Sequence, residues 1–282
     1  MDWEPVAWTE FDGKNIVFTD IQKGPVMRVA TYERGRLRFW TDPFEINVSN
    51  EFHFFTPSDS VQDVTLFAKY TLRADEMFLN RMIGGTFEGS NDPDFREKEV
   101  LYLINEKPKR LQTVVQSYSS KSYRYVRYIG PKYSHCNIAE AAFYTPNDTA
   151  SLKGKVIGTP GCFQKDGSHE YTNVFDGDVT TSFDYIEPSG GWSGLDLGTP
   201  KQIGRIVYTP RSYDNYIRSG DDYELFYCAR RNNWKSLGDQ RSKADSLIYI
   251  KIPVNALLLL CNNTRGIQER IFVYTAAEQI WK

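Results

Sequence analysis

An acidic and hydroxyl-rich stretch, "NVFDGDVTTSF", occupies residues 173–183 between hydrophobic neighbours. Its Asp-Gly-Asp turn places carboxylates, hydroxyl groups and loop carbonyls close together, which is the oxygen-rich environment that Ca²⁺ prefers. The same residues could instead form a simple turn in which the Asp side chains accept hydrogen bonds from backbone amides. The residues alone support both interpretations.

A second polar stretch, "YTPRSYDNYIRSGDDYE", covers residues 208–224 and lies between two expected strands. Its Tyr rings could cover the C–H face of a sugar, while its Arg and Asn side chains could bind hydroxyl groups with defined direction. Neighbouring loops would complete such a site. The candidate ligand-binding residues are Trp192, Arg211, Tyr213, Asn215, Tyr216, Arg218, Asn262 and Arg265. The alternative is a solvated loop in which the Arg side chains pair with Asp214, Asp221 or Asp222.

Residues that could catalyse a reaction are sparse. The three histidines are His53, His135 and His169, and they form no HExxH zinc motif. No GxSxG sequence indicates a serine nucleophile. Asp184 and Glu187 could be proposed as the two carboxylates of a glycosidase, but their closeness in sequence does not establish the separation that a substrate requires. We therefore expect a protein without catalytic activity of its own.

The four cysteines, Cys136, Cys162, Cys228 and Cys261, show no CxxC spacing that would indicate a zinc or redox centre. Cys228 and Cys261 both end strand-like segments, so a disulfide between them is conceivable in an oxidising compartment. Separate buried thiols are the favoured interpretation.

The charge of the chain is balanced, because 34 Lys and Arg residues oppose 36 Asp and Glu residues for a net charge of −2. Such a chain has no positive field with which to hold nucleic acid or an anionic membrane. No apolar run is long enough to span a bilayer, and the first residues lack the pattern of a signal segment. We therefore expect neither a nucleic-acid partner nor a membrane span.

The elements that must position the polar residues are strands. Short segments of alternating polar and apolar residues recur along the chain, and most are bounded by Gly, Pro, Asn or Asp. Examples are "NIVFTD", "RLRFW", "YRYVRYI", "RIVYTP", "YELFYC" and "RIFVYT". Aromatic residues reach 15%, which suits packing on pleated sheets, and long helical periods are absent. The sequence predicts an all-β fold made of tandem β-sandwiches.

An internal echo indicates how these strands are divided among domains. "HCNIAEAAFYT" and "RGIQERIFVYT" each place Glu three residues before Phe, at Glu140 and Phe143 and again at Glu269 and Phe272. The first copy leads into "TPNDTASLKG", a polar stretch typical of a linker. The predicted domains are a small N-terminal β module over residues 1–72, a β-sandwich over residues 73–149 and a complete β-sandwich over residues 151–282.

Several of these motifs together resemble one family. "NVFDGDVTTSF", "GWSGLDLGTPKQIGRIVYTPR", "DDYELFYC", "NNWKSLG" and "ERIFVY" look like successive landmarks of the discoidin or coagulation factor 5/8 type C domain. The resemblance covers residues 153–275. Over residues 76–145 it is partial, because "FEGSNDPDF" is similar to the family's "GSNDG" turn but the opening Asp-Gly loop is missing.

The resemblance implies a galactose-binding-like jelly roll, as in bacterial carbohydrate-binding modules. Members of the family often bind a structural Ca²⁺ with such a loop and with a Glu near the last strand. By position, the resemblance implies a Ca²⁺ site formed by Asp176, Asp178, Thr181 and Glu269, and Phe183 stands where the family usually has Trp.

The resemblance and the polar loops lead to an expected function. We expect a non-catalytic carbohydrate-binding protein, or an accessory module of a secreted or surface glycan-processing system. The alternative is protein–protein or cell-surface adhesion, because the same fold presents its loops to proteins as well as to sugars. The expected partner is a glycan or glycoconjugate, with a larger polypeptide or surface complex as a further partner, and the expected location is extracellular, at the cell surface or periplasmic.

Overall fold

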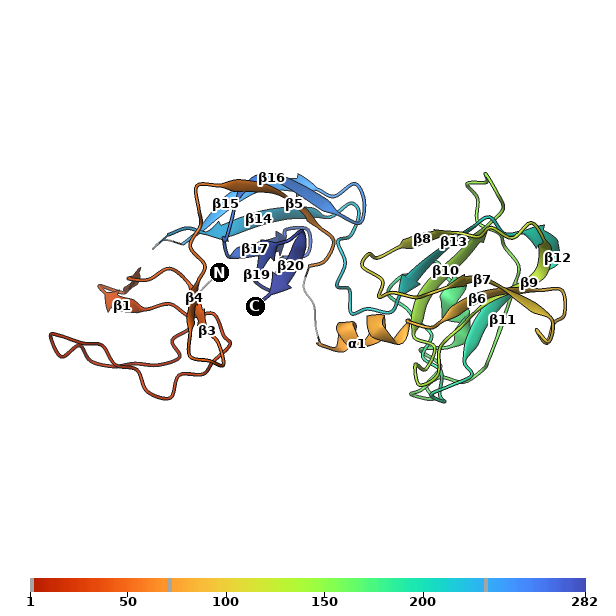
Figure 1. Cartoon of the computed structure of the whole chain (residues 1–282), viewed down its shortest axis with the longest axis horizontal. Coiled ribbons are helices and arrows are strands. Elements are labelled where there is room, and N and C mark those ends of the chain that lie inside the picture. Colours follow the sequence, from red (N-terminus) through yellow and green to blue (C-terminus); the bar gives the residue numbers. More distant parts are fainter. Residues whose placement is uncertain (1–2, 70–72, 231–232) are drawn as a thin grey trace. The chain divides into compact units, whose positions relative to one another are not determined.

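The computed structural model describes residues 3–69, 73–230 and 233–282. Strands account for 42% of the chain and helices for 4%, so the prediction of an all-β fold built of antiparallel sheets is confirmed. The chain forms two compact units (Figure 1). Unit 1 consists of Met1–Tyr70 and Ile217–Lys282, and unit 2 consists of Thr71–Tyr216.

Unit 2 is a β-sandwich of a five-stranded and a three-stranded antiparallel sheet (Figure 1). A short helix, α1 (Arg73–Arg81), precedes the strands, and a 3₁₀ turn, η1 (Tyr171–Phe175), lies between β11 and β12. The five-stranded sheet has the order β11 (Lys155–Gly158), β12 (Trp192–Gln202), β9 (Ser122–Ile129), β6 (Thr86–Ser90) and β7 (Lys98–Leu103). The other sheet has the order β10 (Ile138–Tyr144), β13 (Arg205–Pro210) and β8 (Thr113–Gln116).

The core of unit 2 lies between these two sheets. Phe87 and Tyr128 of the five-stranded sheet belong to one buried cluster with Phe143 and Tyr208 of the three-stranded sheet. The Phe87 ring lies 5.0 Å from the Tyr128 ring and 5.3 Å from the Tyr208 ring. Burying side chains of this size contributes roughly 1.5–3 kcal/mol each, so the alternating aromatic residues of the sequence hold the sandwich together.

Unit 1 combines the last strands of the chain with its first strands. A six-stranded sheet has the order β15 (Trp234–Arg241), β14 (Asp222–Cys228), β17 (Leu258–Asn262), β19 (Phe272–Thr275) and β20 (Glu278–Trp281), and β18 (Ile267–Gln268) pairs with β17. Three two-stranded sheets accompany it. They pair β16 (Leu247–Pro253) with β5 (Val61–Leu66), β1 (Ala30–Glu33) with β2 (Arg36–Phe39), and β3 (Phe44–Ile46) with β4 (Phe52–Phe54).

The N-terminal segment contributes to the core of unit 1. Val64 and Leu66 of β5 are buried in one cluster with Leu247 and Tyr249 of β16, although some 180 residues of sequence separate the two strands. The entropic cost of bringing two strands together grows only slowly with the length of chain between them. The burial of the apolar side chains offsets this cost. The beginning and the end of the chain therefore form one unit.

The predicted domain boundary near residue 150 is not where the structure divides the chain. β10 pairs with β13, and β9 pairs with β12, so strands on both sides of residue 150 share sheets within unit 2. The unit ends at Tyr216, inside the stretch predicted to be a loop of a sandwich over residues 151–282. Local strand patterns do not specify these partners, because the pairing is between segments far apart in sequence.

Two of the expected strands, "RLRFW" and "NIVFTD", have different outcomes. "TYERGRLRFW" forms a hairpin of β1 and β2, in which Arg34 (φ 49°) and Gly35 (φ 80°) make the turn. "NIVFTD", residues 15–20, is not a strand in the structure, because no neighbouring segment pairs with it among the described residues. The expected separate thiols are confirmed, since all four cysteines are free and buried.

Candidate functional site

The carboxylate loop, which we define as Asp176, Asp178 and Thr181, directly follows η1. Asp176 accepts two hydrogen bonds, from the Asp178 amide to Oδ1 (2.7 Å) and from the Thr181 hydroxyl to Oδ2 (2.8 Å). Asp178 Oδ1 accepts hydrogen bonds from the amide and hydroxyl of Thr180 at 2.8 and 2.6 Å. These contacts are the ones expected of a turn that Asp side chains cap.

Glu140 of β10 joins this loop. Its Oε1 accepts a hydrogen bond from the Gly177 amide at 2.9 Å. Burial, and then contact with the Asp176 carboxyl, raises the pKa of Glu140 to about 8. The Glu140 carboxyl is therefore protonated at neutral pH beside the Asp176 carboxyl.

The four residues expected to bind Ca²⁺ do not all lie in one unit. Asp176, Asp178 and Thr181 belong to unit 2, whereas Glu269 is buried in unit 1, where its amide bonds to the Leu260 carbonyl. Within the described part of the chain, no group of three or more His, Cys, Asp or Glu residues is arranged as a metal centre. Glu140, the equivalent of Glu269 in the internal echo, is the Glu that contacts the loop.

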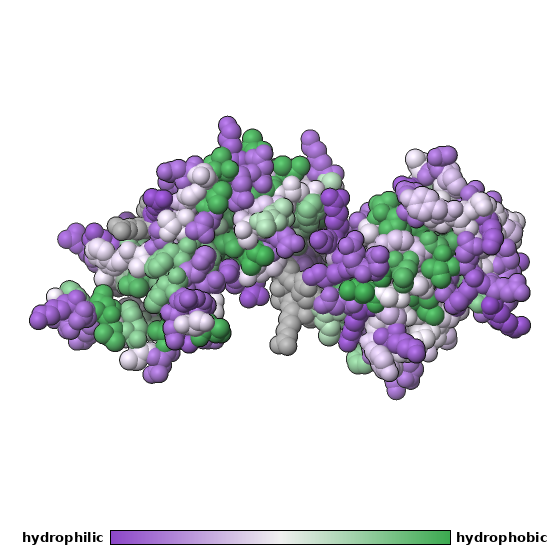
Figure 2. Space-filling model, viewed as in Figure 1, coloured by the Kyte–Doolittle hydropathy of each residue, from purple (hydrophilic) through white to green (hydrophobic). Residues whose placement is uncertain are grey.

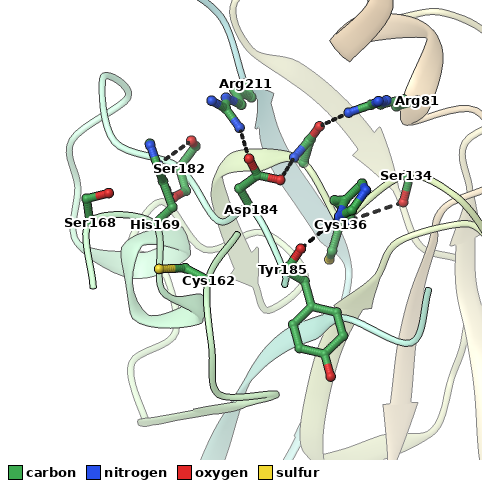
Figure 3. A network of polar contacts seen from close by, with 12 residues as sticks. Arg81, Ser134, Cys136, Cys162, Ser168, His169, Ser182, Asp184, Tyr185 and Arg211 are labelled. Atoms are coloured by element: carbon green, nitrogen blue, oxygen red, sulfur yellow. Dashed lines mark hydrogen bonds and ion pairs between the residues drawn. The ribbon is translucent and has the colours of Figure 1, made fainter. Parts of the chain in front are cut away.

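A buried polar network fixes the neighbouring loops of unit 2 (Figure 3). The Asp184 carboxylate accepts hydrogen bonds from Asn137 Nδ2 (2.7 Å) and from Arg211 Nη1 (2.5 Å). Arg81, at the end of α1, donates to Asn137 Oδ1 at 3.1 Å. Both side chains of the Asp184–Arg211 ion pair are only 12% exposed, so the pair braces the loops and is closed to ligands.

The predicted ligand-binding residues of unit 2 are placed differently from the expectation. Asn215 and Tyr216 are buried, and Tyr213 is half exposed with its ring 5.6 Å from Phe78 of α1. Trp192, at the start of β12, packs with Phe95 and Arg127. The side chains of Asn215 and Tyr216 are therefore not exposed to a ligand.

The remaining predicted ligand residues belong to unit 1. Arg265 Nε donates to Asp221 Oδ2 at 2.7 Å, and Asn262 Nδ2 donates to the same oxygen at 2.9 Å. Arg218 follows the last residue of unit 2 and is likewise part of unit 1. Asp221 of the polar stretch therefore pairs with Arg265, from outside that stretch, whereas Arg211 within it pairs with Asp184.

The residues with catalytic potential do not form a catalytic arrangement. Ser182 Oγ lies 3.4 Å from Nδ1 of His169, but no carboxylate meets the other ring nitrogen anywhere in the residues that the structure describes. Asp184 is held by Asn137 and Arg211, while Glu187 is exposed. The glycosidase pair considered from the sequence lacks two carboxyl groups free to act on one substrate.

Two loops of unit 2 bring the His135 and Phe163 rings together, and Tyr133 lies two residues before His135; we call Tyr133, His135 and Phe163 the aromatic loop site. The His135 and Phe163 rings meet edge to face at 5.5 Å. Phe163 is 57% exposed and Tyr133 is 77% exposed. The sequence interpretation did not select these residues, because a single exposed ring in a loop carries no periodic signal.

Hydrogen bonds from backbone amides hold these two loops in place. The Phe163 amide donates to the Asp184 carbonyl at 2.8 Å, and the Tyr185 amide donates to the His135 carbonyl at 2.7 Å. The Tyr133 amide donates to the Ser189 hydroxyl at 3.1 Å. The loops are thereby tied to the residues around Asp184.

The loop before β10 is strained. Tyr133, His135 and Cys136 have φ values of 65°, 55° and 54°, a region that costs non-glycine residues roughly 1–2 kcal/mol each. Such strain persists only where the surroundings enforce it, and it concentrates at functional sites. The His135 Nδ1 atom lies 2.9 Å from the Tyr185 carbonyl, which can only accept, so Nδ1 carries the proton and Nε2 of the neutral ring is an acceptor.

The fold and the loops define the class of this chain as an all-β protein with a sandwich unit that carries an exposed aromatic surface. No helix among the described residues is long and apolar enough to cross a membrane. No protein-family model matches the chain, and no match is found among the curated proteins or the solved structures.

Proposed function

We propose that the chain is a non-catalytic carbohydrate-binding protein and that the aromatic loop site of unit 2 binds the glycan. The observation that carries the proposal is the exposed Phe163 ring against the His135 acceptor, with the exposed Tyr133 in the same loop as His135. An aromatic face covers the C–H face of a sugar, and His135 Nε2 accepts a hydrogen bond from a hydroxyl group.

The proposed binding is weak and needs no large movement. Hydrogen bonds from the Phe163 and Tyr185 amides hold the loops in one arrangement, so little entropy is lost when a ligand arrives. Exposed rings remain in contact with water, and we expect a dissociation constant on the order of millimolar to tens of micromolar, roughly 4 to 7 kcal/mol. Affinity for a polymer would rise through repeated contacts.

The biological setting is proposed from the discoidin-like motifs of the sequence. A module of this kind would attach a larger polypeptide or surface complex to glycoconjugates outside the cytoplasm, at the cell surface or in the periplasm. Its role in a glycan-processing system would be accessory, because the Asp184 carboxylate is held in an ion pair with Arg211.

A structural Ca²⁺ in the carboxylate loop is part of the proposal, with Glu140 in place of Glu269. The cation would replace the proton of Glu140 beside Asp176, and the Asp178 and Thr181 oxygens would complete the set of hard ligands. The Ca²⁺ ion would have a structural role, because it would hold in place the loop that joins η1 to the core.

Protein adhesion is the second candidate function, and one observation favours it. Ile248 and Ile250 on β16 of unit 1 are 62% and 65% exposed. Hydrophobic residues are visible over this part of unit 1 in Figure 2. Adjacent exposed apolar side chains on a strand are typical of a surface that contacts another protein.

Affinity electrophoresis of the full chain in gels that contain galactan, xylan, mannan or mucin tests the carbohydrate proposal. We expect at least one polymer to retard the wild type. Phe163→Ala should weaken this affinity about 3- to 10-fold, the contribution of one stacked ring. The control Tyr118→Ala removes a ring of unit 2 that is 92% exposed and outside the site, and it should be retarded normally. Equal retardation of Phe163→Ala, or no retardation in any gel, would favour the adhesion function.

A further inference from the structure

We propose that a groove beside the β6–β7 hairpin of unit 2 is a second ligand site, specific for an uncharged, polyhydroxylated ligand. This groove, called the hairpin groove below, has a volume of about 450 Å³, within the range of small-molecule sites. It is lined by Gly89, Ser90, Asn91, Asp92, Glu97, Lys98, Glu99, Lys121 and Tyr123. The proposal does not depend on the aromatic loop site.

The lining contains both hydrogen-bond donors and acceptors. Lys121 Nζ donates to Glu99 Oε2 at 2.9 Å, and Lys98 Nζ lies 2.7 Å from Oε1 of the buried Glu88. Each ammonium group has three donors, so each can still donate to a ligand. Hydrogen bonds from Lys121, Ser119 and Tyr123 lower the pKa of Glu99 to about 2, which keeps it an acceptor.

The walls of the groove are held rigidly. Asn91 Nδ2 donates to the Ser122 carbonyl at 3.0 Å, and Asn91 Oδ1 accepts from the Arg124 amide at 2.9 Å, so the loop after β6 is tied to β9. Ser90 Oγ donates to the Glu97 carbonyl at 2.6 Å and joins the two ends of the hairpin loop. A prearranged site binds its ligand without a large entropy loss.

The charges of the lining indicate the class of ligand. Three carboxylates, on Asp92, Glu97 and Glu99, lie beside two ammonium groups, on Lys98 and Lys121. This near balance provides little field for an ion of either sign, and both ammonium groups are already in ion pairs with Glu side chains, which further lowers the gain for an anionic ligand. Vicinal hydroxyl groups, which donate and accept at once, match neighbouring carboxylate and ammonium groups.

The hairpin groove is independent of the aromatic loop site. It lies at the beginning of β9, whereas Tyr133 and His135 follow the end of this eight-residue strand. The strand rises about 3.3 Å per residue, so the two sites are separated by roughly 25 Å. Substitutions at that separation act independently, and each site can be tested without disturbing the other.

The test is amide NMR of the ¹⁵N-labelled full chain, titrated with galactose, mannose, N-acetylglucosamine and lactose. We expect saturable shifts of amides in Gly89–Asp92 and Lys98–Glu99 with at least one neutral sugar, unchanged between about 50 mM and 0.5 M NaCl because no ligand charge is screened. Glu97→Ala should weaken this binding about 10-fold or more, the contribution of a hydrogen bond to a charged group. The control Glu106→Ala removes an exposed acid of the same unit outside the groove and should bind normally.

Arginine and glucuronate serve as charged probes in the same titration. Shifts in the groove with either charged probe alone, or shifts that salt abolishes, would overturn the assignment of a neutral ligand. The absence of groove shifts with every sugar would overturn the site itself. Shifts confined to the amides of Tyr133, His135 and Phe163 would overturn the groove while supporting the aromatic loop site, so the two proposals fail separately.

Discussion

Arg211 shows how the surroundings of a side chain decide its role. It was selected as a ligand-binding residue, and the structure places its guanidinium against Asp184 and 4.4 Å from the centre of the Phe78 ring. Sequence shows that an Arg lies in a Tyr- and Asn-rich loop. It does not show that an Asp 27 residues earlier is buried beside it.

Removing this guanidinium should destabilise unit 2. Arg211→Met leaves the Asp184 carboxylate buried with only Asn137 as a side-chain partner, and breaking a buried ion pair in this way costs about 3–5 kcal/mol. The control Arg241→Met breaks an exposed pair with Asp222 and should cost about 0–1 kcal/mol. Denaturant unfolding measures both, and similar losses for the two variants would contradict the structural role of Arg211.

The carboxyl pair of Glu140 and Asp176 should make stability depend on pH. The pKa of Glu140 in the folded protein, about 8, exceeds its ordinary value of 4.5. The protonated carboxyl is therefore favoured by folding, and its stabilisation is complete at low pH and is lost as pH rises through about 8. In the presence of a chelator, the melting temperature of the wild type should fall as the pH rises from 4.5 to about 8. Glu140→Gln should show a smaller fall over the same pH range.

Addition of Ca²⁺ separates the cation from the proton. If the cation binds the native loop, it should restore the melting temperature of the wild type near pH 8 and have little effect on Glu140→Gln. Glu140→Gln keeps the size of the side chain and serves as the matched control. An unchanged melting temperature on Ca²⁺ addition would eliminate the calcium proposal, and identical pH profiles for the two proteins would contradict the carboxyl pair.

Part of the carboxylate loop and its contact with Glu140 could be predicted from individual residues. The acidic and hydroxyl residues of the carboxylate loop were found from their spacing, and the internal echo contained, as its first copy, the Glu that contacts the loop, Glu140. Glu269 was chosen because it occupies the family position near the last strand of the expected domain. Whether Glu140 or Glu269 lies beside the loop depends on which strands belong to the same unit. The sequence alone does not show which strands share a unit.

At the scale of elements, the pairing of β12 with β9 leaves no room beside Gly194. A Cβ at this position would lie 2.2 Å from the Val126 carbonyl oxygen, so the strand backbones would have to separate. Gly194→Ala should therefore destabilise unit 2 by about 3 kcal/mol or more. Thr199→Ala, on the exposed part of the same strand, should cost little, and thermal unfolding compares the two. Equal stability would show that the strands adjust without strain.

Strands were the most predictable elements, and their partners were the least predictable. "YRYVRYI" and "RIVYTP" are within β9 and β13, because alternation reports a half-buried strand directly. "NIVFTD" has the same alternation but no partner strand among the described residues. A strand needs its ladder of hydrogen bonds as well as its side-chain pattern, and only the pattern is local.

At the scale of the whole molecule, the division into units gives a prediction opposite to the one from sequence. A fragment of residues 71–216 retains both sheets of unit 2 and should melt cooperatively. A fragment of residues 151–282 lacks β9, which pairs with β12, and lacks β8 and β10, which pair with β13. It also lacks β5, the partner of β16, so it should not melt cooperatively. Circular dichroism melts of the two fragments decide this, and a cooperative melt of the second alone would contradict the units.

The crystal structure of the full chain with a glycan that retards it in affinity gels tests the central claim most directly. The account predicts a sugar ring over the face of Phe163, with one hydroxyl within hydrogen-bond distance of His135 Nε2. A sugar in the hairpin groove as well would be compatible with this result. A glycan bound elsewhere, with Phe163 and His135 free of it, would contradict the claim that the aromatic loop site is the carbohydrate-binding surface of the protein.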